Sequence, residues 1–288
     1  MRDTTTIHPS RFVAVSRVMA AITAAVGMIA LVGWVLDARV LHSVSPDLMA
    51  MRDSAALAFV LLGLALLFLP QDPENRTCLR ITATLASCGV LLGLLTVLQY
   101  LFEVDLGMDG LLFEDNTVRN PGAPPGRMSA AAAVDFILLG LAILLNVRRT
   151  AVVLAQTATA VALLVAMIAF SGYCFGVAPF YEFGSLSTMA LNTSVAFLVL
   201  AVGTLFSRPA AGLMAVVSSN TMAGATARRL LPIAMVLPFA VGWLRLQGQR
   251  AGWFELEVGI ALLSVATVVT LFTLTYLTTS SLMRAEKQ

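Results

Sequence analysis

The order of apolar and polar residues divides this chain into long apolar runs joined by polar connectors. The runs lie at about 13–36, 54–69, 79–102, 128–149, 151–175, 188–206, 230–246 and 256–279. An α-helix needs about 20 predominantly apolar residues to cross the hydrocarbon core of a bilayer, and most of these runs have that length. The pattern therefore predicts an all-α integral membrane protein with eight transmembrane helices. We expect a membrane domain over 13–279, between a polar segment at 1–12 and a short tail at 280–288.

Composition agrees with this class of protein. Apolar residues make up 59% of the chain and charged residues 12%, whereas soluble domains carry about 25% charged residues. The three cysteines show no paired spacing, so neither a disulfide framework nor a metal site is expected. The sequence contains no catalytic motif and no basic region interleaved with aromatic residues. It therefore predicts neither an enzyme nor a partner for nucleic acid, and it leaves the cofactor open.

One motif occurs three times within the apolar runs. Its anchor is a phenylalanine, with a methionine eight residues before it and a small residue four residues after it. The anchors are separated by 77 and then 61 residues, and the three copies read Met51, Phe59 and Gly63; Met128, Phe136 and Gly140; Met189, Phe197 and Ala201. Such a recurrence predicts duplicated supersecondary units in which these residues form packing contacts.

The runs that precede the motif also end alike. Their last residues read GWVLD at 33–37, QYLFE at 99–103 and GYCFG at 172–176, and the run at 230–246 ends in GWLRL. Aromatic belts at membrane interfaces place Trp and Tyr at such positions without further meaning. Together with the motif in the following run, however, the pattern predicts four tandem helical hairpins, of which three carry the full motif.

The distribution of charge predicts the topology. With eight spans, 12 of the 18 basic residues lie on the side of the chain termini, whereas 11 of the 16 acidic residues lie on the opposite side. Basic excess marks the cytoplasmic side of a membrane protein. We therefore expect both termini in the cytoplasm and the connector 103–127 outside it.

The residue of greatest chemical interest is Asp135, where the other copies of the motif have Ala58 and Ala196. It lies about 9 Å along the helix from Ser129. A carboxylate at that depth must face the bundle, find a partner or carry a proton. It is either a group that senses a ligand, cation or proton, or a structural hydrogen-bonding group. Its expected neighbours are Gln99, Tyr100 and Arg127. Five acids in 103–127 offer a weaker candidate cation site.

Nearly the whole chain resembles a known kind of sensor. The motif residues, PPGRMSAAAAVDFILLGLA at 124–142, and GLMAVVSSNTMAGATARRLLP at 212–232 are similar to the multi-span N-terminal sensor region of bacterial sensor histidine kinases. Similar regions precede PAS and diguanylate cyclase domains. The resemblance implies an input domain in the bacterial inner membrane that drives a cytoplasmic output. No output signature occurs in the 288 residues, so we expect either the sensor region of a longer protein or a stand-alone relative that lacks an output.

The last two runs suggest how a signal would leave the membrane. Pro232 and Pro238 interrupt the seventh run and predict a kinked, compliant helix. The tail around Ser281 and Leu282 contains no Gly or Pro, which favours a continuous helix leading to the output. Such outputs work in pairs, so we expect a homodimer in the lipid bilayer. A small transporter or channel is the alternative, although the runs contain few polar residues to line a path.

Overall fold

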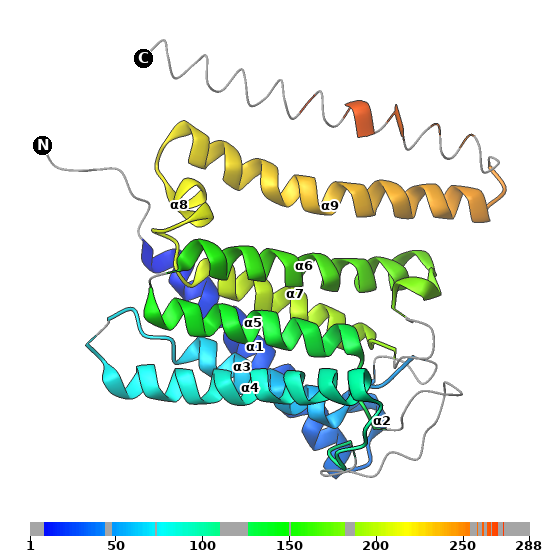
Figure 1. Cartoon of the computed structure of the whole chain (residues 1–288). Helices are drawn as coiled ribbons and strands as arrows, with labels where there is room; N and C mark the ends of the chain where they lie inside the picture. Colours follow the sequence, from blue (N-terminus) through cyan, green and yellow to red (C-terminus); the bar gives the residue numbers. More distant parts are fainter. Residues whose placement is uncertain are drawn as a thin grey trace, which may run out of the picture.

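The computed structural model describes residues 9–43, 48–72, 74–109, 126–149, 151–181 and 188–253, with scattered positions from 258 to 273. The described chain is helical, as predicted (Figure 1). Five of its helices are long and apolar enough to cross a membrane, and two shorter apolar helices accompany them. Most of the eighth predicted span, with Ser281 and Leu282, lies outside the described residues, as do most residues of the predicted external connector.

Six helices form the body of the molecule, and α9 lies beside it. The body consists of α1 (Pro9–Val35), α3 (Asp53–Leu67), α4 (Arg76–Phe102), α5 (Ala130–Arg148), α6 (Val152–Phe175) and α7 (Leu191–Phe206). Short helices lie in the connections: α2 (Arg39–His42), the 3-10 helix η1 (Ala178–Phe180) and α8 (Leu213–Ser218). The long helix α9 (Met222–Arg250) follows.

The body has an inner set of helices and an outer set. The inner helices α3, α5 and α7 contact one another. The outer helices each pack against two inner ones: α1 against α3 and α7, α4 against α3 and α5, and α6 against α5 and α7. The outer helices begin where the inner ones end (Figure 1). We call the end at which α3, α5 and α7 begin the aromatic end, and the end at which they finish the basic end.

The three motif phenylalanines meet where the inner helices face one another. Phe59, Phe136 and Phe197 are fully buried, and their ring centroids are 4.8, 4.7 and 4.6 Å apart. The rings meet edge-to-face or tilted, the arrangements that aromatic quadrupoles prefer. The residue that anchors the sequence motif is thus also the residue that anchors the core.

The small motif residues let the outer helices approach closely. A β-carbon added at Gly63 would lie 2.7 Å from the backbone nitrogen of Ala24 on α1. One added at Gly140 would lie 2.5 Å from the Val90 side chain on α4. Helices in a membrane associate through such close van der Waals packing, because lipid provides no hydrophobic drive between them.

The inner and outer helices also have equivalent boundaries. Each inner helix begins after an extended residue that directly follows a motif methionine: Arg52, Ser129 and Ala190, with ψ of 148°, 148° and 153°. Each outer helix is followed within two residues by a residue with left-handed backbone, three positions after the aromatic residue: Asp37, Glu103 and Gly176, with φ of 51°, 52° and 70°. Left-handed caps commonly end helices.

The region before the seventh run differs from the prediction. The apolar runs leave a connector between 206 and 230, but α8 and the start of α9 occupy much of it. The Thr221 side chain accepts a hydrogen bond from the backbone of Gly224 and so caps α9 well before the apolar run. The helix continues through Pro232 and Pro238 to Arg250. Gly242 packs on Phe175 of α6, so α9 is attached to the body mainly through aromatic contacts near Phe239.

The phenylalanine cluster yields a test of this packing. We expect Phe136→Ala to lower the free energy of unfolding by about 3–5 kcal/mol, because the neighbouring rings cannot fill the cavity. Leu141→Ala on the same helix is the control, since Leu141 is 42% exposed. Reversible unfolding in detergent measures both variants. Equal losses for the two would contradict a core centred on the phenylalanines.

Candidate functional site

The aromatic end carries the same hydrogen bond three times. The Trp34 indole donates to the carbonyl oxygen of Met51 at 2.9 Å. The Tyr100 hydroxyl donates to that of Met128 at 3.0 Å, and the Tyr173 hydroxyl donates to that of Met189 at 2.6 Å. Each bond joins the end of an outer helix to the start of an inner one. The aromatic residues therefore have a structural partner inside the protein.

Each of these aromatic rings is covered by a further side chain. His42 stacks on Trp34 with ring centroids 4.6 Å apart, and Tyr181 stacks on Tyr173 at 4.0 Å. The Arg127 guanidinium lies over the Tyr100 ring, 5.3 Å from its centre. Burial lowers the pKa of His42, so its imidazole stacks as a neutral ring at pH 7.

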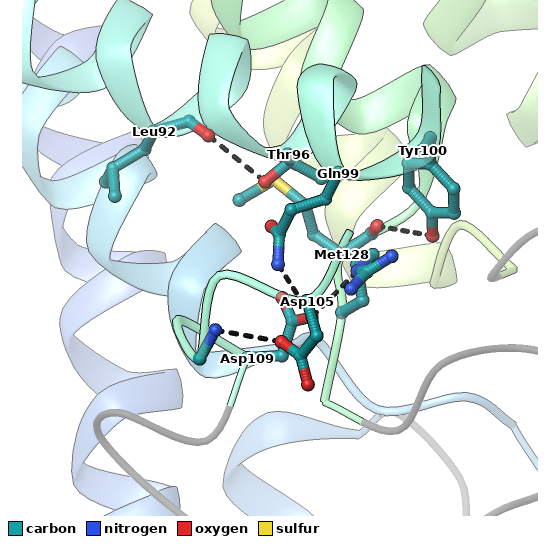
Figure 2. A network of polar contacts seen from close by, with 9 residues as sticks. Leu92, Thr96, Gln99, Tyr100, Asp105, Asp109 and Met128 are labelled. Atoms are coloured by element: carbon teal, nitrogen blue, oxygen red, sulfur yellow. Dashed lines mark hydrogen bonds and ion pairs between the residues drawn. The ribbon is translucent and has the colours of Figure 1, made fainter. Parts of the chain in front are cut away.

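A cluster of polar side chains lies at the bond between Tyr100 and Met128. We call it the Asp109 cluster, and it consists of Gln99, Tyr100, Asp109 and Arg127. The Gln99 amide nitrogen donates to Asp109 Oδ2 at 3.1 Å, and Arg127 Nε donates to the same oxygen at 2.7 Å (Figure 2). Gln99 and the Arg127 side chain are almost completely buried. The cluster therefore fixes both ends of the predicted external connector to the bundle.

Arg52 lies beside the Asp109 cluster at the start of α3. Burial lowers the pKa of Arg52, and the negative charges of Asp53 and Asp109 and the Tyr100 hydroxyl oppose this change. The residue before α3, the end of α4 and the connector between α4 and α5 thus contribute charged or polar groups to one place. The structure brings together Gln99, Tyr100 and Arg127, which the sequence offered as neighbours of Asp135, but Asp109 is the carboxylate that joins them.

Asp135 is not joined to these three residues. It is fully buried on α5, directly before Phe136, and both of its carboxyl oxygens lack a hydrogen-bond partner among the described residues. The recorded bonds of Gln99 and Arg127 go to Asp109 instead. A buried carboxyl without a partner is energetically costly, whereas the corresponding residues Ala58 and Ala196 are simply packed. Asp135 is therefore a local departure from a well-packed core.

The alanine on α7 that corresponds to Asp135 lies beside a cavity. Ala196 lines an apolar cavity of about 340 Å³ between α1, α6 and α7, together with Thr23, Val26 and Phe170. The Thr23 hydroxyl donates to the carbonyl of Met19 on its own helix. The Asn192 amide, which also lines the cavity, donates to the carbonyl of His42. Both polar side chains of the lining are therefore bonded within the protein.

The basic end carries a second polar cluster that the sequence did not reveal. The buried Arg208 guanidinium donates from Nε and Nη2 to the carbonyl of Asn146 at 3.3 and 3.0 Å, and from Nη2 to that of Pro70 at 3.0 Å. Nη1 donates to the Gln71 side chain at 3.3 Å. Arg208 thus joins the carboxyl ends of α3, α5 and α7, where the helix dipoles are negative.

The polar side chains of these two clusters hold the ends of the helices together. No group of three or more His, Cys, Asp or Glu residues that could hold a metal ion occurs in the described part of the chain. The described acids of the candidate cation site form no such group: Asp109 binds Gln99 and Arg127, and the Asp105 carboxylate accepts a hydrogen bond from the backbone of Gly107. Comparison with protein families, with curated proteins and with solved structures found no match to this chain.

Two features escaped sequence reasoning for the same reason. The aromatic donors and their methionine acceptors are 17, 28 and 16 residues apart, so no fixed spacing marks the bond. Arg208 binds residues 62 and 138 positions away. For the aromatic hydrogen bonds, the available signal was that an aromatic residue, a connector and a motif methionine follow one another in the same order three times. For the contacts of Arg208, the sequence holds no local signal.

Removal of the Asp135 carboxyl is expected to stabilise the protein. Because its carboxyl has no partner, we expect Asp135→Ala to raise the free energy of unfolding by about 1–3 kcal/mol, the cost of an unsatisfied buried polar group. Ser194→Ala is the control on α7, since the buried Ser194 hydroxyl already bonds to its own helix at Leu191. Reversible unfolding in detergent at pH 7 measures both. A loss of stability in Asp135→Ala would mean that the carboxyl has a structural partner.

Proposed function

We propose that this chain is a membrane-embedded input domain that senses a stimulus at or in the bilayer and transmits it to a cytoplasmic output. The main observation that supports the proposal is the environment of the Asp135 side chain. A fully buried carboxyl without a described partner stands beside the phenylalanine cluster, in a core that is otherwise closely packed. Stability lost at one position of a repeated scaffold is typical of a position retained for function.

The proposal includes the architecture that the sequence predicts. The three inner and outer helix pairs are duplicated hairpins, and α9 forms a fourth with the predicted span at about 256–279. Equivalent phenylalanine contacts, hydrogen bonds and caps support the duplication. The fourth pair departs from the others, since α9 continues to Arg250, seven residues beyond Trp243.

The proposed signal path begins at the core and ends at α9. α5 packs along α6, and α6 meets α9 through Phe170 and Phe175 against Phe239. The apolar side chains of α9 are mostly exposed, so this helix is held less firmly than the others. A change in the charge or hydrogen bonding of Asp135 would shift α5 against its neighbours and reach the loosely held helix last.

The closed core argues against the transporter alternative. A path along the bundle axis would need polar groups, but the phenylalanine cluster occupies the centre of the described bundle. The buried hydroxyls of Thr96, Thr159 and Thr204 bond to carbonyls of their own helices. These groups therefore serve the helices that carry them.

The proposed orientation places the basic end in the cytoplasm of a bacterial cell, within the inner membrane. Val40, at the aromatic end, is 87% exposed, and Glu74, at the basic end, is exposed too. In a chain whose native cysteines are replaced by serine, we expect an impermeant thiol reagent to label Val40→Cys in intact cells. Glu74→Cys should react only after permeabilisation. Labelling of Glu74→Cys in intact cells would reverse the topology.

Coupling to an output is tested by fusing a dimeric diguanylate cyclase module after Gln288. If the last span continues as a helix through Ser281 and Leu282, each alanine inserted between them rotates the module by about 100°. Cyclase activity should then oscillate over one to four insertions. Substitution Asp135→Asn should fix the output in one state, whereas Ser194→Ala should not. A flat insertion series together with an unchanged Asp135→Asn variant would contradict the input role.

A further inference from the structure

Two arginine side chains converge at the basic end without a carboxylate between them. Arg208 donates to the carbonyl of Pro70 and to the side chain of Gln71. Arg149, which directly follows α5, donates from Nη2 to the carbonyl of Gln71. The two guanidinium groups therefore meet at the same dipeptide, beyond the end of α3.

The acceptors of both guanidinium groups are neutral oxygens. Among the described residues, neither arginine has a carboxylate within ion-pairing distance. Asp72 is adjacent to Gln71 in the chain, but its carboxylate accepts a hydrogen bond from the backbone of Glu74. Burial and the neighbouring Arg149 lower the pKa of Arg208 to about 10, so the Arg208 guanidinium stays positive at pH 7. Two like charges thus share one place, offset only by helix dipoles.

The position along the membrane is that of lipid headgroups. α5 has 19 residues and is therefore about 28 Å long, close to the thickness of the hydrocarbon core. Arg149 is the residue after it, with left-handed backbone at φ 56°, a conformation in which glycine is the usual residue. Its side chain is exposed, and most of its five donors are free to bind a ligand.

We propose that Arg149 and Arg208 form a binding site for the phosphate group of an anionic membrane lipid. Guanidinium groups bind phosphate through paired, charge-assisted hydrogen bonds. Basic pockets between transmembrane helices are suited to anionic headgroups. Arg208, held by three helices, supplies a fixed charge, and Arg149 supplies the free donors. A lipid bound here would hold the ends of α3, α5 and α7 together, independently of any signalling role.

The test uses the full chain, stripped of lipid in a neutral detergent, with thermal unfolding followed by tryptophan fluorescence. Phosphatidylglycerol should raise the unfolding temperature, and phosphatidylcholine and inorganic phosphate should not. In Arg149→Gln we expect the midpoint of the phosphatidylglycerol titration to rise about fivefold or more, the effect of one basic residue near an anionic lipid. Arg149→Lys should restore part of the affinity, since lysine also binds phosphate.

Arg148→Gln is the matched control, because Arg148 is adjacent, exposed and equally charged. We expect its midpoint to change less than twofold. Equal weakening in the Arg148 and Arg149 variants would overturn the site in favour of a general attraction to the basic surface. An equal effect of inorganic phosphate would overturn the assignment to lipid. Since Arg149 is exposed, its glutamine variant should unfold at the original temperature without lipid, which separates binding from folding.

Discussion

The mutual contact of three phenylalanine rings is the constraint on which this bundle depends. Phe59, Phe136 and Phe197 come from three different helices, and each ring touches the other two. Their contact fixes the height and rotation of α3, α5 and α7 relative to one another. The outer helices then fit the grooves between the inner ones, and Gly63 and Gly140 allow close approach there. Lipid solvates apolar side chains well, so a membrane protein gains its specificity from such fitted contacts.

Polar bonds close the bundle at both ends. At the aromatic end, each outer helix is joined to the next inner helix by a donor from Trp34, Tyr100 or Tyr173 to a backbone carbonyl. At the basic end, the single guanidinium of Arg208 joins all three inner helices. Among the described residues, the first arrangement occurs three times and the second once.

Two features of the molecule depart from this regular arrangement. Asp135 introduces a carboxyl where the equivalent residues are alanine, and α9 lies outside the ring of close contacts. A strained group in a rigid core and a loosely attached helix beside it are the two parts that a switch requires. The rigid frame is what would make a small change at Asp135 move helices as units, because packed interfaces shift between discrete arrangements.

The sequence alone determined the helical class, the positions of most helices and the residues of the core. Apolar run length and the register of Phe59, Phe136 and Phe197 are local properties, and burial in a bundle requires them directly. The tertiary structure alone decided that Asp109 is the partner of Arg127, that Asp135 stands apart, and that Arg208 binds three helix ends. It also decided that α9 begins at Met222, through a cap that the apolar pattern does not record. Hydrogen-bond partners are chosen by distance in space, and connectors of unequal length remove any fixed spacing by which the sequence could report them.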